Sequence, residues 1–78
     1  MWSVYVMESL KDDDLYVGMA TDVILRFEEH QSGKVRSTKA RRPFRLLYAE
    51  KVGSSAEARK REKFLKTGTA KEFLKSLK

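Results

Sequence analysis

The N-terminal part of the chain carries four side chains that could take part in hydrolysis of a phosphate ester: Tyr5, Tyr16, Arg26 and His30. Arg26 and His30 are four positions apart and share a face of any helix that contains both. An arginine can stabilise charge that grows on a phosphoryl group, and a histidine can pass on a proton near neutral pH. A phenol hydroxyl can position an attacking water, and beside a cation it can deprotonate that water. Taken singly, core tyrosines, an exposed arginine and a histidine at a helix end are the commoner explanations.

A carboxylate occupies an unusual place in the second half of the chain. Ala58, Glu62 and Leu65 recur at the spacing of one helix face, which predicts that Glu62 points towards the core. A carboxylate buried without a partner costs several kcal/mol, so it would need an arginine or a metal ion. The alternative is a partly exposed glutamate at the edge of the apolar face, paired with a lysine.

Positive charge is concentrated in the second half of the sequence. The net charge is +6; residues 1–33 hold seven acids and two bases, whereas residues 34–78 hold four acids and fifteen bases. Such a field attracts polyanions, and binding to nucleic acid would depend on salt because counterions are released. A charged surface that only keeps the protein soluble is the alternative.

The densest basic segment, from Lys34 to Arg45, contains six bases in twelve residues. We interpret it as a loop that binds phosphates, with a solvated mobile connection as the alternative. The expected nucleic-acid-binding residues are Lys34, Arg36, Lys39, Arg41 and Arg42. The three aspartates at 12–14 lack the ligand spacing of a calcium loop, so we expect a solvated turn there.

Strands and helices can be placed from the periodicity of apolar residues. Alternation predicts strands over residues 2–9 and 15–18, joined by a polar turn into an antiparallel hairpin, and a third strand over 44–52. Helices are expected over residues 22–31, 55–67 and 70–77.

Capping residues mark the ends of these helices. Thr21 or Asp22 can cap the first helix, and Gly33 can end it. Ser54 and Glu57 have the spacing of a capping box for the second helix, which Gly68 is expected to close in the left-handed conformation. Thr69 with Glu72 repeats the box before the third helix.

The order ββαβαα predicts an α/β fold of the α+β type, with a three-stranded, mainly antiparallel sheet flanked by three helices. Leu, Ile, Val and Phe make up 19 of the 78 residues, which is enough for a single domain over residues 1–78. The absence of cysteine excludes disulfides and fits a reducing compartment. Neither a membrane span nor a signal peptide is recognisable, so we expect a cytoplasmic protein without membrane contact.

Three short motifs come in a characteristic order. Ser3-Val4-Tyr5 and Tyr16-Val17-Gly18 lie on the predicted hairpin, Arg26 and His30 on the next helix, and Glu57-Ala58 with Glu62 on a later helix. In this order and spacing they resemble the GIY-YIG nuclease superfamily over nearly the whole chain. The similarity is greatest to its small stand-alone bacterial proteins, in which stretches like His30–Lys34, Arg36–Lys39 and Arg42-Pro43 are typical.

The resemblance implies a divalent-metal-dependent endonuclease that hydrolyses phosphodiester bonds of nucleic acid. DNA is the expected polymer, cut according to its structure, in repair or recombination. Its catalytic residues would be Tyr5, Tyr16, Arg26, His30 and Glu62, with Glu62 the ligand of one Mg²⁺ or Mn²⁺ ion. Either tyrosine could be the general base, and His30 could assist it.

Two departures from the family pattern affect this interpretation. Ser3 replaces the glycine of the first motif, and Met19 stands where some relatives place a lysine, which leaves less positive potential beside Tyr16. The alternatives are a non-catalytic nucleic-acid-binding module of the same fold and a protein-interaction subunit. A nuclease this small could also rely on a protein partner for targeting.

Overall fold

The strand β1 (Trp2–Ser9) is the central strand of a three-stranded sheet. In the computed structural model, which describes residues 1–78, this strand is buried on both of its faces. Val4 and Val6 point to one face, and Tyr5 and Met7 point to the other. Each face must therefore be covered by helices.

The sheet has the strand order β2-β1-β3, with β2 (Leu15–Ala20) and β3 (Phe44–Gly53) at its edges. Both neighbours run antiparallel to β1, so the sheet is antiparallel throughout. β2 is two residues longer than the sequence predicted, because Met19 and Ala20 continue the pairing opposite Val4 and Ser3. The expected order ββαβαα is confirmed.

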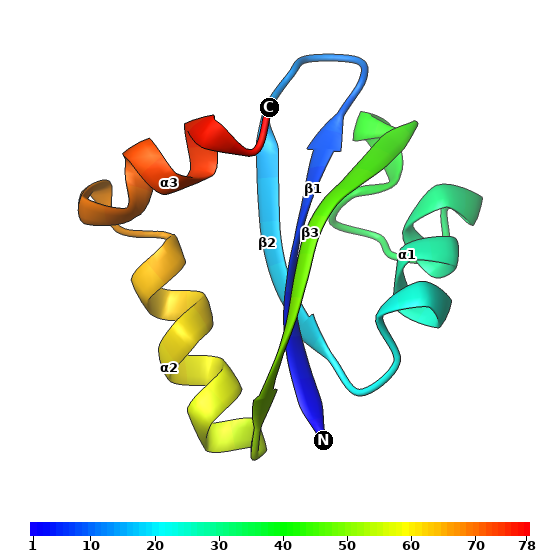
Figure 1. Ribbon diagram of the computed structural model, residues 1–78. Coiled ribbons are helices and arrows are strands. Elements are labelled where there is room, and N and C mark those ends of the chain that lie inside the picture. Colours follow the sequence, from blue (N-terminus) through cyan, green and yellow to red (C-terminus); the bar gives the residue numbers. More distant parts are fainter.

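Helices cover the two faces of the sheet separately (Figure 1). α1 (Val23–Ser32) lies on one face, and α2 (Ser55–Leu65) and α3 (Lys71–Ser76) lie on the other. On the α1 face, Val23 and Phe27 pack against the cluster formed by Tyr5, Met7, Ala20 and Phe44. These two apolar residues of α1, which are four positions apart, therefore face the sheet.

The larger core lies under α2 and α3. Val4, Val6 and Val17 of the sheet pack against Ala58, Leu65 and Ala70. Three apolar residues at the C-terminal end of the chain, Phe73, Leu74 and Leu77, cover them. Full burial of one such aliphatic side chain stabilises the fold by roughly 1.5–3 kcal/mol. None of the helices combines the length and the apolar character that crossing a membrane requires.

Three of the predicted helix caps are present. The side chain of Asp22 accepts a hydrogen bond from the backbone N–H of Leu25, and Gly33 ends α1 in the left-handed conformation at φ 83°. At the start of α2, Ser54 and Glu57 form the expected reciprocal capping box.

The predictions for the end of α2 and the start of α3 were wrong. α2 ends at Leu65, and the hydroxyl of Thr67 donates to the carbonyl of Phe64, so no left-handed residue is needed there. Gly68 instead begins a right-handed 3-10 turn, η2 (Gly68–Ala70). Because this turn leads directly into α3, Ala70 occupies the capping position, and Thr69 forms no cap.

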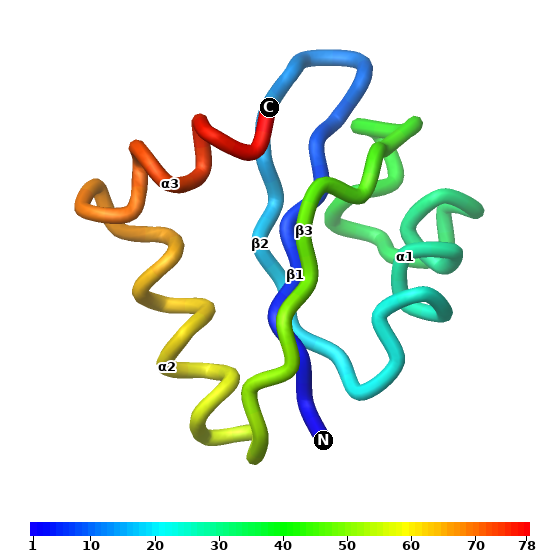
Figure 2. The backbone as a smooth tube through the Cα atoms, in the orientation of Figure 1, coloured from blue at the N-terminus to red at the C-terminus, as the bar shows by residue number.

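The basic segment between α1 and β3 stays on the side of the sheet that α1 covers (Figure 2). It contains a short 3-10 helix, η1 (Lys39–Arg41), and Thr38 just before it is buried. The hydroxyl of Ser9 donates to the carbonyl of Arg41 at 2.7 Å, which fastens the segment to the end of β1. The segment is therefore an anchored connection.

Candidate active site

Tyr5 lies across the backbone of the edge strand β2. Gly18 is its direct partner in the antiparallel pairing, so the two residues share a face of the sheet. A Cβ atom at Gly18 would lie 2.5 Å from the hydroxyl oxygen of Tyr5 and 2.6 Å from its Cζ atom. The phenol therefore fills the space that a side chain at Gly18 would need, and its hydroxyl lies over the edge strand.

The hydroxyl of Tyr5 is held by His30, which comes from α1. The hydroxyl oxygen lies 2.8 Å from Nε2 of His30, and both side chains are fully buried. Nδ1 of His30 lies 2.8 Å from the hydroxyl oxygen of Thr38. His30 is thus fixed between a strand and the basic segment, and it reaches any substrate only through Tyr5.

Tyr16 is the more accessible of the two tyrosines. Its ring packs against those of Tyr5 and His30, with centroid separations of 6.3 Å and 5.1 Å. Its hydroxyl makes no hydrogen bond within the chain and is not buried. The hydroxyl of Tyr16 is therefore free to bind a water molecule or a phosphate oxygen.

Arg26 lies beside Tyr5 with its side chain 40% exposed. One guanidinium nitrogen pairs with Glu29 at 3.2 Å, and the residue lines a hollow together with Trp2 and Met19. A pairing at such an accessible place is weak, on the order of 1 kcal/mol or less, so Arg26 can exchange Glu29 for a phosphate.

Burial controls the protonation of Tyr5 and His30. Burial raises the pKa of Tyr5 to about 12, and the neighbouring Tyr16 makes the next largest contribution to this rise. The guanidinium of Arg26 acts in the opposite direction. Burial and then the charge of Arg26 lower the pKa of His30, and Glu29 opposes them weakly. At neutral pH both side chains are therefore uncharged.

Glu62 approaches the site from the opposite face of the sheet, because α2 carries it (Figure 1). Its carboxylate contributes to raising the pKa of Tyr5, so the two side chains are close enough to interact electrostatically. The side chain of Glu62 is 21% exposed, and one oxygen lies 3.9 Å from Nζ of Lys66. The sequence left two arrangements open for Glu62, a buried carboxylate and a partly exposed one paired with a lysine. The structure has the second arrangement, with Glu62 at the edge of the apolar face and Lys66 nearby.

The carboxylate of Glu62 suits a hard cation that keeps most of its own water. No group of three or more His, Cys, Asp or Glu side chains is arranged to enclose a metal ion. Glu62 can nevertheless contribute a ligand, because its long contact with Lys66 leaves the other carboxylate oxygen without a protein partner. Mg²⁺ is commonly held in this way, by one or two carboxylates and several waters.

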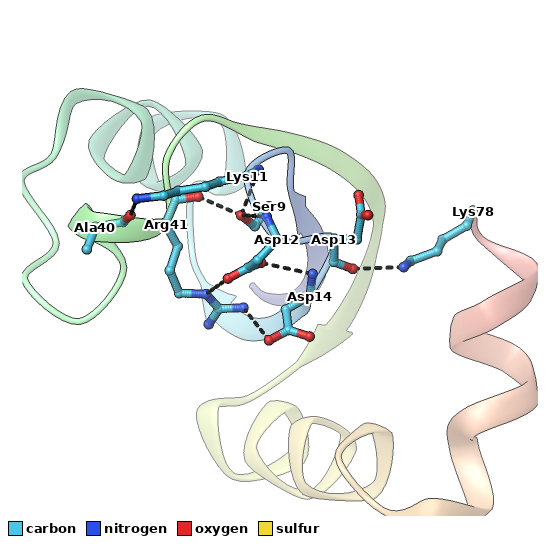
Figure 3. A network of polar contacts seen from close by, with 8 residues as sticks. All are labelled: Ser9, Lys11, Asp12, Asp13, Asp14, Ala40, Arg41 and Lys78. Atoms are coloured by element: carbon cyan, nitrogen blue, oxygen red, sulfur yellow. Dashed lines mark hydrogen bonds and ion pairs between the residues drawn. The ribbon is translucent and has the colours of Figure 1, made fainter.

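Arg41 differs from the other bases of the segment. Its guanidinium lies 3.4 Å from a carboxylate oxygen of Asp12 and 3.5 Å from one of Asp14 (Figure 3). The turn at residues 12–14 is exposed, as expected, and it also pairs with Arg41. Arg41 fastens the segment to the β1–β2 turn, and its charge is compensated within the chain.

The four other bases expected to bind nucleic acid, Lys34, Arg36, Lys39 and Arg42, are exposed. Arg42 is the most constrained of them, because its guanidinium lies over Gly33 and its Nε donates to the carbonyl of Lys39 at 2.9 Å. None of the four pairs with a carboxylate. Their positive charge is therefore available to a polyanion.

The sequence matches the family of the GIY-YIG catalytic domain over residues 1–75. The chain belongs to the GIY-YIG family. The match confirms the resemblance seen in the motifs over nearly the whole length of the chain. The GIY-YIG family is a nuclease superfamily.

Relatives within the GIY-YIG family include small proteins of similar length. A UPF0213 protein of Staphylococcus aureus is 41% identical over 76 residues, which cover 96% of this chain and 92% of the relative. The UPF0213 protein SH2523 of Staphylococcus haemolyticus is 40% identical, with coverages of 95% and 90%. The solution NMR structure of the UPF0213 protein BH0048 from Bacillus halodurans is 40% identical and superimposes with a TM-score of 0.58, covering all of this chain and 86% of the other.

The GIY-YIG motifs acquire a structural explanation here. The glycine of the second motif, Gly18, is required because the phenol of the first motif, Tyr5, occupies its side-chain position. Ser3, which replaces the glycine of the first motif, is buried opposite Ala20 and is small enough to fit.

Thr38 was not predicted as part of the site. In the sequence it stands out only as part of the family-typical stretch Arg36–Lys39, which does not reveal that it meets His30.

Proposed function

We propose that this member of the GIY-YIG family is a divalent-metal-dependent endonuclease that hydrolyses phosphodiester bonds, with DNA as its substrate. The observation that carries the proposal is the convergence of Tyr5, Tyr16, Arg26 and Glu62 at the β2 edge of the sheet from both of its faces. This set combines a group that can orient water, a cation for the phosphoryl group and a free carboxylate oxygen.

The burial of each tyrosine suggests different roles. The free hydroxyl of Tyr16 would contact the attacking water, because the hydroxyl of Tyr5 is occupied by His30 and its pKa is raised to about 12. Tyr5 would instead position its neighbours. The sequence does not decide which tyrosine is the general base. Their different burial favours Tyr16 as the one that activates water.

Arg26 would stabilise the negative charge that grows on the phosphoryl oxygens. Its partial exposure allows a phosphate to approach, and its planar fork of donors suits two phosphate oxygens. Removing one such donor from other enzymes costs about 10²–10³-fold in rate.

Glu62 would hold one Mg²⁺ or Mn²⁺ ion. When bound, such an ion supplies positive charge that stabilises the leaving oxygen. Lys66 would then give up its long contact with Glu62 and turn to a neighbouring phosphate.

The exposed bases Lys34, Arg36, Lys39 and Arg42 would hold the nucleic acid through its phosphates, which carry no sequence information. Recognition would therefore depend on the shape of the substrate. A preference for branched or flapped DNA would connect the enzyme with repair or recombination.

The proposal can be tested with labelled single-stranded, double-stranded, flapped and branched substrates of DNA and RNA, each with Mg²⁺, with Mn²⁺ and with a chelator. We expect metal-dependent cleavage, with DNA structures cut faster than RNA. Salt-dependent binding without cleavage of any substrate would contradict the proposal and favour the non-catalytic nucleic-acid-binding module.

A further inference from the structure

Tyr5, His30 and Thr38 form a buried line of polar contacts, and Arg26 interacts with Tyr5 at one end of it. The contacts run from Tyr5 to Nε2 of His30 at 2.8 Å, and from Nδ1 of His30 to the hydroxyl of Thr38 at 2.8 Å. The hydroxyl of Thr38 lies 3.4 Å from the carbonyl oxygen of Val35 and is placed to donate to it. No side-chain atom along this line is buried without a partner.

One direction of these hydrogen bonds fits their last acceptor. The hydroxyl of Thr38 is placed to donate to the carbonyl of Val35, and in that arrangement the Nδ1–H of His30 donates to the oxygen of Thr38. A neutral imidazole carries one N–H, so Nε2 is left as an acceptor. The O–H of Tyr5 therefore points towards His30.

Resting on the proposed function, we propose that Thr38 is a positioning residue that fixes the Nδ1–H tautomer of His30 and thereby turns a lone pair of Tyr5 towards Arg26. With the opposite tautomer, Nε2–H would donate to Tyr5, and the O–H of Tyr5 would point towards the guanidinium. Two donors would then face each other, and Arg26 would lose its orientation beside the phosphate.

The surroundings of His30 favour the neutral ring that this arrangement needs. On α1, the charged groups near the ring are Arg26 and Glu29. The sheet contributes Tyr5 from β1, Tyr16 from β2 and the apolar ring of Phe44 from β3. Burial is the largest effect and acts against protonation, so His30 is uncharged at neutral pH.

His30 is the only histidine in the chain, so its ring nitrogens can be assigned in an NMR spectrum without ambiguity. We expect ¹⁵N shifts of the Nδ1–H tautomer in the wild type and in Thr38→Ser, which keeps the hydroxyl. In Thr38→Val, which has nearly the same volume, Nδ1–H would be buried without an acceptor, so the Nε2–H tautomer should dominate.

Cleavage provides the second measurement. Groups that orient a catalytic side chain typically contribute 10–100-fold, so we expect kcat of Thr38→Val to fall by at least about tenfold with little change in KM, and Thr38→Ser to retain most of the activity. A merely structural role would instead be seen as a lower free energy of unfolding with the tautomer unchanged.

The two measurements separate the failure of this inference from the failure of the proposed function. The Nε2–H tautomer in the wild type, or an unchanged tautomer in Thr38→Val, would overturn the role of Thr38 whether or not the enzyme cleaves. A wild type that cleaves no substrate but shows the Nδ1–H tautomer would contradict the nuclease and leave the hydrogen-bond direction supported. If Thr38→Val does not fold, Thr38→Ala, which also removes the hydroxyl, takes its place, and an unchanged tautomer in that variant would overturn the role of Thr38.

Discussion

The phenol of Tyr5 occupies the position that a side chain at Gly18 would take, with the hydroxyl oxygen 2.5 Å from the place of a Cβ atom. A contact this short cannot be accommodated unless a ring or a strand moves. The relationship explains how a buried tyrosine on the central strand presents its hydroxyl at the edge of the sheet. It also makes this glycine part of the site although it has no side chain.

We predict that Gly18→Ala destabilises the protein by about 1–3 kcal/mol, the usual cost of overpacking a well-packed region, and impairs cleavage. Urea denaturation gives the free energy of unfolding. Gly68→Ala is the matched control, because nothing lies within 4 Å of its Cβ position, and we expect it to be neutral or stabilising by about 0.4–1 kcal/mol. Equal effects of the two substitutions would show that Tyr5 does not depend on Gly18.

Arg26→Ala should lower the rate of single-turnover cleavage by on the order of 10²-fold, because its charge is needed most in the transition state. Arg26→Lys should restore little of the rate, since an ammonium lacks the planar fork. Arg59, an exposed arginine on α2, provides the control Arg59→Ala, which should cleave normally. A loss of affinity at an unchanged rate would redefine Arg26 as a phosphate anchor.

The two kinds of arginine in the basic segment should behave differently. Arg36→Ala should reduce the salt dependence of DNA binding by about 0.9 in the slope of log K against log salt, the contribution of one phosphate contact. Arg41→Ala should leave that slope unchanged and lower the free energy of unfolding by about 1 kcal/mol or less, because Arg41 pairs with Asp12 and Asp14. Titrations at several salt concentrations test both statements, and the reverse pattern would contradict them.

Stability should fall as the solution becomes mildly acidic. The pKa of His30 is lowered in the folded state, so the unfolded chain binds the proton first. The stabilisation is complete above about pH 6.5, the unfolded value, and is lost as the pH falls towards the folded pKa, by at most about 1.4 kcal/mol per pH unit. The free energy of unfolding of the wild type at pH 7.5 and pH 5.5 measures the effect.

His30→Gln is the control for this titration, because it replaces the titrating imidazole with a polar amide that does not titrate. Its stability should change less between the same two pH values. Arg45, and to a smaller extent Lys78, lower the pKa of Glu8 in the folded state. Protonation of Glu8 therefore adds a separate loss of stability, but only at pH values below the usual carboxyl range. A wild type and a His30→Gln variant with the same pH dependence would contradict the account of His30.

The local elements of the fold could be predicted because their signals are local. Alternation along β1 and the caps at Asp22 and Ser54 each depend on a few neighbouring residues. The end of α2 was mispredicted because the hydroxyl of Thr67 competes with Gly68 for the role of stop signal. Periodicity also does not show that α1 and α2 cover opposite faces.

The residue types at the site could be predicted, but their environments could not. Tyr5 and Tyr16 look alike in the sequence, and only the pairing of β1 with both neighbouring strands buries the first more deeply. The partners of Arg41 lie almost thirty residues away in sequence, so composition alone suggests a free charge. Thr38 meets His30 only after the basic segment folds back onto α1.

Glu62→Gln tests most directly whether Glu62 holds the metal ion needed for cleavage, because it removes the charge with little change in volume. Single-turnover cleavage of the best substrate with Mg²⁺ or Mn²⁺ should be compared with that of Glu28→Gln, an exposed glutamate on α1. We predict that Glu62→Gln abolishes cleavage while folding and DNA binding remain near those of the wild type, and that Glu28→Gln cleaves normally. Cleavage by Glu62→Gln at the wild-type rate would contradict the account.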